Sequence, residues 1–317
     1  MHPHFPPVQP HVHRTHAVAA RTHPAWPHSA LPTGPRWARA VCVCGWSECA
    51  ESHRDARALA RHHRRFAYGQ PFYLSGWASR IGSRRLQADA TGTHVDITGC
   101  RRAWAIADGI GDRPLSVYAA GCAATSSAYA AADRGARAGL LTAGTALGGH
   151  SDGDTVLVVA TPRTDLGGAG WDIAWVGSCR AYEYRPDDGA LVQLTTDHTQ
   201  GQKLRDALAS RYRDRPGELE KLAAASDHIV TSSVATAATT VGSVTTTGRR
   251  GRLLLTTDGI HGPVPHDTLR RITALQITPQ ACARLLTLAA THFGGTDNAT
   301  AMIIDPGDIA ARLGKQR

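Results

Sequence analysis

Two apolar segments that lie far apart in the chain each end in an aspartate followed by a glycine. AWAIADGIGD (103–112) carries Asp108 and LLLTTDGIHG (253–262) carries Asp258. An aspartate after a strand often serves only a turn, because its side chain accepts backbone hydrogen bonds and the glycine adopts unusual dihedrals. The alternative is metal binding, since carboxylates on rigid strand ends are hard oxygen ligands for Mg²⁺ or Mn²⁺. The repetition favours the metal without deciding the matter.

Two further acids and one arginine extend this set. TDNAT places Asp297 directly before the strand-like run AMIID, and GSRRLQADA places Asp89 five residues after Arg84. Taken alone, Asp297 fits a helix-to-strand turn and Asp89 fits a solvated loop equally well. Several carboxylates brought together without a cation would have raised pKa values, so a shared cation is the simplest reason to gather them.

Short strand-like segments separated by Gly and Asp turns must position these side chains. We predict helices at about 114–147, 202–209 and 279–293, and an antiparallel meander over 171–194. Strands in adjacent pairs with grouped helices favour an α+β layered domain over a regular βαβ alternation. The predicted strands, each bounded by turn residues, are RRAWAIAD, DTVLVVATP, WDIAWVG, RAYEYR, RLLLTTD and ATAMIID.

The order of these motifs resembles that of the PPM, or type 2C, metal-dependent serine/threonine protein phosphatases. The resemblance runs from about Gly76 to Asp305 and rests on five short motifs in the right order. It implies an antiparallel β-sandwich flanked by helices on both sides, with two Mn²⁺ or Mg²⁺ ions at one edge. It also implies attack on phosphorus by a metal-activated water, without a protein nucleophile.

The resemblance assigns a role to each motif residue. The catalytic residues would be Arg84, Asp108 and Asp258, with Arg84 gripping the phosphate through its planar fork. Asp108 would bridge the two metals, and Asp89 would act largely through metal-bound waters. The implied metal ligands are Asp89, Asp108, the carbonyl of Gly109, Asp258 and Asp297.

Three positions depart from the family pattern. Ala88 replaces an acidic residue, Asp112-Arg113 replaces glycine-histidine, and WVGSCR places Ser178 where the family has an aspartate that helps to hold a third metal. A hydroxyl is a poor substitute for that carboxylate. We therefore expect Mn²⁺-dependent hydrolysis of phosphoserine or phosphothreonine in a phosphoprotein, at a reduced rate. The alternative is a weak or inactive phosphatase-like protein that binds a phosphoprotein or a regulatory partner.

The N-terminal part differs in composition from the rest. We expect a disordered His/Pro-rich arm at 1–35, a small basic helical module at 36–68 and the phosphatase-like domain at 69–317. Ser52 followed by Asp55 resembles a capping box and predicts a basic helix of about four turns. The module also holds a candidate zinc site, with His62 or His63 as substitutes for one ligand. The candidate ligands are Cys42, Cys44, Cys49 and His53.

The net charge of +9 is concentrated in this N-terminal part. Residues 1–68 contain nine Arg and three acids, which predicts a contact with an acidic protein or a nucleic acid. The four Cys outside this module are scattered through apolar surroundings, so we expect reduced thiols and a cytoplasmic protein. No apolar stretch reaches the roughly 18 residues that a membrane span needs.

Overall fold

The computed structural model describes residues 15–19, 38–42, 46–50, 52–67, 73–98, 101–148, 153–163, 170–246 and 251–307. They belong to two compact units. The first unit consists of residues up to Leu74 together with Val95–Arg101. The second unit, which carries all the candidate phosphatase motifs, consists of Ser75–His94 and the chain from Arg102 onward.

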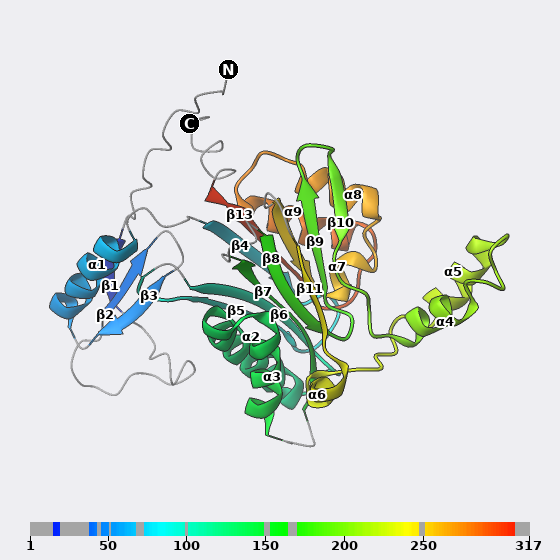
Figure 1. Cartoon of the computed structure of the whole chain (residues 1–317), viewed down its shortest axis with the longest axis horizontal. Helices are drawn as coiled ribbons and strands as arrows, with labels where there is room; N and C mark the ends of the chain where they lie inside the picture. Colours follow the sequence, from blue (N-terminus) through cyan, green and yellow to red (C-terminus); the bar gives the residue numbers. More distant parts are fainter. Residues whose placement is uncertain are drawn as a thin grey trace. The chain divides into compact units, whose positions relative to one another are not determined.

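Two five-stranded sheets form the centre of the second unit (Figure 1). The strand pairings on which the candidate site depends, β12 with β13 and β6 with β7, are antiparallel. In spatial order the first sheet consists of β10 (Ala190–Gln193), β9 (Arg180–Arg185), β12 (Arg252–Thr256), β13 (Ala299–Pro306) and β4 (Tyr73–Arg80). The second sheet consists of β11 (Gly242–Thr245), β8 (Gly170–Val176), β7 (Thr155–Arg163), β6 (Arg102–Gly109) and β5 (Asp89–Val95).

Helices cover the outer face of each sheet, which confirms the predicted helix-flanked sandwich (Figure 1). Against the second sheet pack α2 (Pro114–Arg134) and α3 (Ala136–Leu147). The first sheet is covered by α7 (Asp258–His261), α8 (His266–Thr273) and α9 (Pro279–His292). Between β10 and β11 the chain forms α4 (Gln200–Leu208), α5 (Pro216–Ala224), the short 3₁₀ helix η1 (Val234–Thr236) and α6 (Ala237–Thr240).

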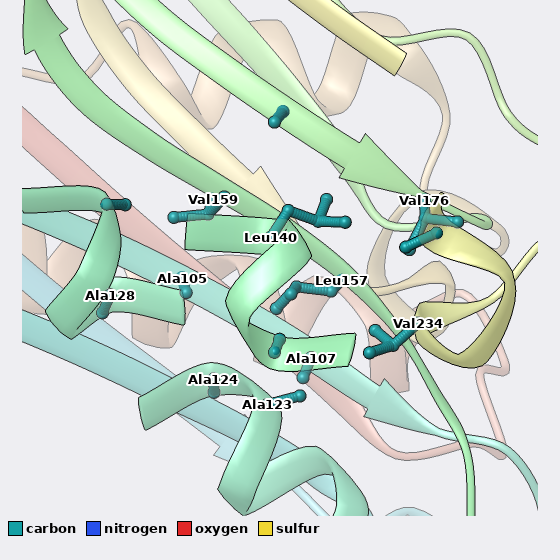
Figure 2. Packing of buried hydrophobic residues seen from close by; sticks show 14 of the residues in the cluster. Ala105, Ala107, Ala123, Ala124, Ala128, Leu140, Leu157, Val159, Val176 and Val234 are labelled. Carbon is teal, nitrogen blue, oxygen red and sulfur yellow. The ribbon is translucent and has the colours of Figure 1, made fainter. Parts of the chain in front are cut away.

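The alternation of side chains along β6 decides where Asp108 points. Ala105 and Ala107 pack against the small residues of α2, including Ala124 (Figure 2). Successive strand residues point to opposite faces, so Trp104 and Asp108 project from the other face, toward the interior of the sandwich. The alanine-rich contact lets α2 approach β6 closely, and the strand ends are held on a rigid layer.

The helical tract predicted at 114–147 is two helices rather than one. The break is at Gly135, whose φ of 88° is left-handed and whose N–H donates to the carbonyl of Ala131. Asp172 of β8 then accepts a hydrogen bond of 2.8 Å from the N–H of Ala136 and satisfies the first turn of α3.

The predicted meander at 171–194 is wrong in its first connection. β9 and β10 pair antiparallel as expected, but β8 lies in the second sheet and β9 in the first. Gly177, with φ of 85°, turns the chain between the two sheets, where an added Cβ would overlap the side chain of Val156. The turn therefore carries Ser178 across the edge of the sandwich instead of along one sheet.

The first unit combines a sheet with the predicted helix. The predicted helix start is confirmed, because the Ser52 hydroxyl accepts a hydrogen bond from the N–H of Asp55 and donates one to the Asp55 carboxylate at the start of α1 (His53–Ala67). Beside this helix the unit contains an antiparallel sheet that the sequence analysis did not predict, formed by β1 (Thr15–Ala19), β2 (Ala38–Cys42) and β3 (Ser47–Ala50). β1 falls in the segment expected to be disordered, and the rest of 1–35 lies outside the described residues.

Among the described residues, the helices are all too short or too polar to cross a bilayer.

Candidate functional site

A pocket of about 220 Å³ opens at the edge of the sandwich where β6 and β12 end. Asp89 is the exception among the six residues that the sequence singled out as a metal and phosphate site, and the other five line the pocket: Arg84, Asp108, Gly109, Asp258 and Asp297. Its lining consists of Arg84, Asp108, Gly109, Ile110, Gly111, Asp112, Val156, Ser178, His228, Val230, Asp258, Asp297 and Asn298.

The two Asp-Gly glycines are needed because other backbone passes directly over them. A Cβ on Gly109 would overlap the carbonyl of Ser116 at the start of α2. A Cβ on Gly259 would overlap the carbonyl of Asn298. The glycines therefore let the strand ends pack tightly, and Asp108 and Asp258 are brought to the same pocket.

Asp108 and Asp258 line the same pocket, and the charge of Asp258 disfavours the ionised form of Asp108. Loss of water raises the pKa of Asp108 well above its usual range, and repulsion from Asp258 and Asp89 adds to that rise. Burial and the charge of Asp297 likewise raise the pKa of Asp258. Without a cation, this pair therefore retains a proton where an ordinary aspartate would have lost it.

Asp89, at the start of β5, is only 8% exposed. Burial, with added repulsion from Asp258 and Asp297, raises the pKa of Asp89 to about 7. Thr257 donates a 3.0 Å hydrogen bond to its Oδ2, whereas its Oδ1 is buried without a hydrogen-bond partner. A buried carboxylate oxygen left without a donor is what a cation, or a water bound to one, would satisfy.

Arg84 and Asp297 form an ion pair at the mouth of the pocket. Arg84 donates a 2.6 Å hydrogen bond to Oδ2 of Asp297, and both side chains are partly exposed. This hydrogen bond is the main reason that the pKa of Arg84 is raised. In this arrangement the arginine neutralises one of the candidate metal ligands and faces the pocket.

The loop that carries Arg84 is clamped by Asn298, which the sequence motifs did not single out. Asn298 donates to the carbonyl of Ile81 and accepts from the N–H of Ala88, at 2.7 and 2.8 Å. The side chain is 4% exposed and bonded on both of its amide atoms, so the two ends of the loop are held together. Its position next to Asp297 in TDNAT was the available signal.

Asp112 fixes the middle of the same loop. Its carboxylate accepts hydrogen bonds from the N–H groups of Arg85 and Leu86, at 3.3 and 3.1 Å, and lies 3.6 Å from the Arg85 guanidinium. Partial burial raises the pKa of Asp112, but these bonds outweigh it and the net shift is downward. Asp112 therefore supports the residue next to Arg84.

Ser178 lies between this pocket and a second hollow of about 580 Å³. It is 4% exposed and lines both spaces, so the position expected for a third-metal aspartate is occupied by a buried hydroxyl. Two residues further on, Arg180 forms a bidentate ion pair with Asp197, with the closest contact at 2.6 Å. This pair braces the wall of the second hollow.

His228 also lines both spaces, and sequence patterns gave no sign of it. Its segment is ordered by pairing with the chain before α4, because Thr199 and Val230 form an antiparallel bridge. The neighbouring Asp227 receives two hydrogen bonds, of 2.6 and 2.7 Å, from Arg205 of α4. The backbone around His228 is thus held by a strand-like pairing and an ion pair, and the exposed His228 side chain stands at the boundary between the two spaces.

The donor chemistry suits a divalent cation, although the side chains are not yet arranged around one. Raised carboxylate pKa values and the unsatisfied oxygen of Asp89 fit an oxygen-ligated metal. However, no three His, Cys, Asp or Glu side chains of the described chain converge closely enough to hold an ion. Asp297 is paired with Arg84 through its Oδ2.

The prediction of a zinc site in the N-terminal module is not supported either. Cys42, Cys49 and His53 do not form such a group among the described residues, and Cys44 lies outside them. His63 is buried and stacked on Trp46 instead.

Several solved structures that share this fold are serine/threonine phosphatases. A serine/threonine phosphatase from Staphylococcus aureus aligns at 18% identity over 73% of this chain and 93% of its own, with a TM-score of 0.58. A PPM Ser-Thr phosphatase from Mycobacterium smegmatis, in complex with cacodylate, aligns at 23% identity over 73% and 97%, with a TM-score of 0.54.

The catalytic domain of the phosphatase PstP, in complex with two manganese ions, aligns at 23% identity over 74% and 99%, with a TM-score of 0.55. No protein-family model and no curated protein matches the sequence. The chain therefore has the fold of the PPM serine/threonine phosphatases.

Proposed function

We propose that the chain is a Mn²⁺- or Mg²⁺-dependent protein serine/threonine phosphatase with reduced activity. The observation that carries the proposal is one pocket lined by Arg84, Asp108, Asp258 and Asp297, of which the three aspartates lie at or next to strand ends. The raised pKa values of Asp108 and Asp258 support it, because a cation would relieve the repulsion that raises them. The fold it shares with phosphatases, one of them bound to two manganese ions, supports the same chemistry.

The chemistry assigns a task to each side chain. Asp108, the carbonyl of Gly109, Asp258 and Asp297 would hold the two ions, and Asp89 would orient water bound to them. The ions would supply Lewis-acid polarisation of the phosphoryl oxygens and a water of lowered pKa. Arg84 would leave Asp297, and its guanidinium would donate hydrogen bonds to two oxygens of the phosphoryl group. Asn298 and Asp112 keep the Arg84 loop in place.

His228 would donate a proton to the leaving serine or threonine oxygen. Its imidazole, which can carry a proton on either ring nitrogen, lines the first pocket, and its backbone is ordered by the Thr199–Val230 bridge. We expect His228→Gln to lower hydrolysis of a phosphoserine peptide about 100-fold. Hydrolysis of p-nitrophenyl phosphate, whose leaving group needs no proton, should change less than about twofold. An equal loss on both substrates would contradict this role.

Hydrolysis of p-nitrophenyl phosphate with and without Mn²⁺ tests the proposed function. Wild type should be active only with metal, and Asp258→Ala should lose at least about 100-fold, since groups that merely orient metal ligands are worth 10–100-fold. Asp187→Asn, in the exposed turn after β9, removes the same charge away from the pocket and should match wild type. Undiminished activity in Asp258→Ala would refute the proposal.

The second candidate is a phosphatase-like protein that binds a phosphoprotein without turning it over. Ser178 in place of a carboxylate favours it, as does the ion pair that occupies Asp297. Tight binding of a phosphoserine peptide with Mn²⁺, without phosphate release, would support this candidate. We favour catalysis, because a site that no longer binds metal has no physical reason to keep mutually repelling carboxylates together.

We also propose that the basic N-terminal region binds an acidic protein or a nucleic acid. Acidic proteins and nucleic acids both complement its charge.

A further inference from the structure

Four arginines form a single stripe along α1. Arg54, Arg57, Arg61 and Arg64 follow one another at spacings of three, four and three residues, and all four are exposed. At about 100° per residue, they fall within an arc of about 80° on the helix surface. At a rise of about 1.5 Å per residue, the stripe is about 15 Å long.

A different face of α1, centred about 110° around the helix from the stripe, is fixed against its own unit. Ala56, Ala60 and His63 are buried on that face. The His63 ring stacks on Trp46 with centroids 4.3 Å apart, and its Nδ1 donates a 2.7 Å hydrogen bond to the carbonyl of Ile97. These contacts set the rotation of the helix, so the arginine stripe lies on its solvent face.

The charge of the stripe is not compensated within the described chain. None of the four arginines makes an ion pair with a described residue, whereas arginines elsewhere do, such as Arg205 and Arg252. The one acid of α1, Asp55, accepts a 2.6 Å hydrogen bond from Ser52 at the helix start. It serves the cap and leaves the four positive charges free to attract an anion.

The surroundings of the stripe select the kind of anion. The other exposed residues between Arg54 and Arg64 are Asp55, Ala58 and His62, so this face has no large apolar side chain. A membrane-surface helix needs an apolar face in the lipid, and protein interfaces depend on buried aromatic or aliphatic anchors. Phosphate contacts need neither, and the guanidinium fork matches phosphate oxygens. An α-helix also fits the major groove of B-form DNA.

We propose that α1 binds duplex DNA through its phosphate backbone, with Arg54, Arg57, Arg61 and Arg64 as the contacts. The stripe reads phosphate and not base sequence. This site is independent of the phosphatase pocket and of the function proposed for it.

Fluorescence anisotropy with a labelled 20-base-pair duplex of mixed sequence tests the proposal on the full chain. Four phosphate contacts contribute about −3.6 to the slope of log K against log salt, which is about a 150-fold loss of affinity between 50 and 200 mM. Changing all four arginines to glutamine should make the slope shallower by about 3.6. A control changes four exposed arginines of the second unit to glutamine, namely Arg137, Arg211, Arg213 and Arg284.

The control lowers the net charge by the same amount, so it should change the slope by less than about one. Circular dichroism on both variants checks that α1 and the sheets still form. An equal loss in both variants would show that diffuse charge is responsible, and it would overturn the proposal. Competition by poly-glutamate as strong as by unlabelled DNA, at equal charge, would assign the stripe to acidic proteins and overturn it too.

Discussion

Replacing Asp89 by asparagine is predicted to stabilise the metal-free protein, and increasingly so as the pH rises. Asp89 is 8% exposed, and burial beside Asp258 and Asp297 raises its pKa from 3.8 to about 7. A raised pKa in the folded state means that the folded protein binds this proton more tightly than the unfolded chain, so the protonated carboxyl group stabilises the fold. Its contribution is fully present below the unfolded pKa, near 4, and is lost as the pH rises through the folded pKa, near 7.

The magnitude follows from the two pKa values. A difference of about three pKa units between the folded and unfolded states lowers the unfolding free energy of wild type by about 4 kcal/mol between pH 4 and pH 8. About 2.5 kcal/mol of this loss falls between pH 5 and pH 8. Asparagine does not titrate and can still accept the hydrogen bond from Thr257. The unfolding free energy of Asp89→Asn minus that of wild type should therefore increase by about 2.5 kcal/mol over this interval.

Urea unfolding in EDTA at pH 5, 6, 7 and 8 measures this difference. The matched control is Asp187→Asn, an exposed turn aspartate, whose difference from wild type should stay constant with pH. A difference for Asp89→Asn that is flat or decreases toward pH 8 would refute the claim that a buried, repelled carboxylate lies at the site. With saturating Mn²⁺ the pH dependence of wild type should flatten, because a bound cation favours the ionised carboxylates.

Three further substitutions test the Arg84 loop, the third-metal position and a buried ion pair. Asp112→Ala should reduce kcat/KM about tenfold, mostly through KM, because it frees the Arg84 loop, whereas Asp112→Asn should lose less. Ser178→Asp should increase kcat at saturating Mn²⁺ by restoring a carboxylate, and Ser178→Ala should not; no gain with aspartate would contradict the loss of a third ion. Arg252→Met should lower the free energy of unfolding in urea by about 3–5 kcal/mol, because it leaves the fully buried Asp305 carboxylate without its partner. A loss below about 1 kcal/mol would mean that Asp305 is not held as a buried charge.

The layered fold and the carboxylates of the pocket could be predicted because they follow from local patterns. Apolar runs that end in Asp-Gly mark strand ends, and packed strands bring such ends to one edge. Side chains that act through backbone contacts were marked only by their position near a motif residue, and their roles could not be predicted from it. Asn298 and Asp112 hold one loop by bonds to residues distant in sequence, and nothing in their neighbours indicates those partners.

The wrong and the missing predictions also have physical causes. Gly177 turns the chain from one sheet to the other, a change that alternation within β8 and β9 does not encode. The strands of the first unit are four or five residues long and too short for a periodic signal to stand out. His228 was missed because its place depends on the pairing of the segments around α4 and α5, where no motif marks it.

The central proposal is that the carboxylates of the pocket hold metal ions, and that water activated by these ions hydrolyses a phosphomonoester. Release of inorganic phosphate from a phosphoserine peptide, by wild type and by Asp108→Asn with and without Mn²⁺, is the decisive measurement. We expect release by wild type only with Mn²⁺ and a loss of at least about 100-fold in the variant. Metal-independent release, or equal release by the two proteins, would contradict the proposed chemistry.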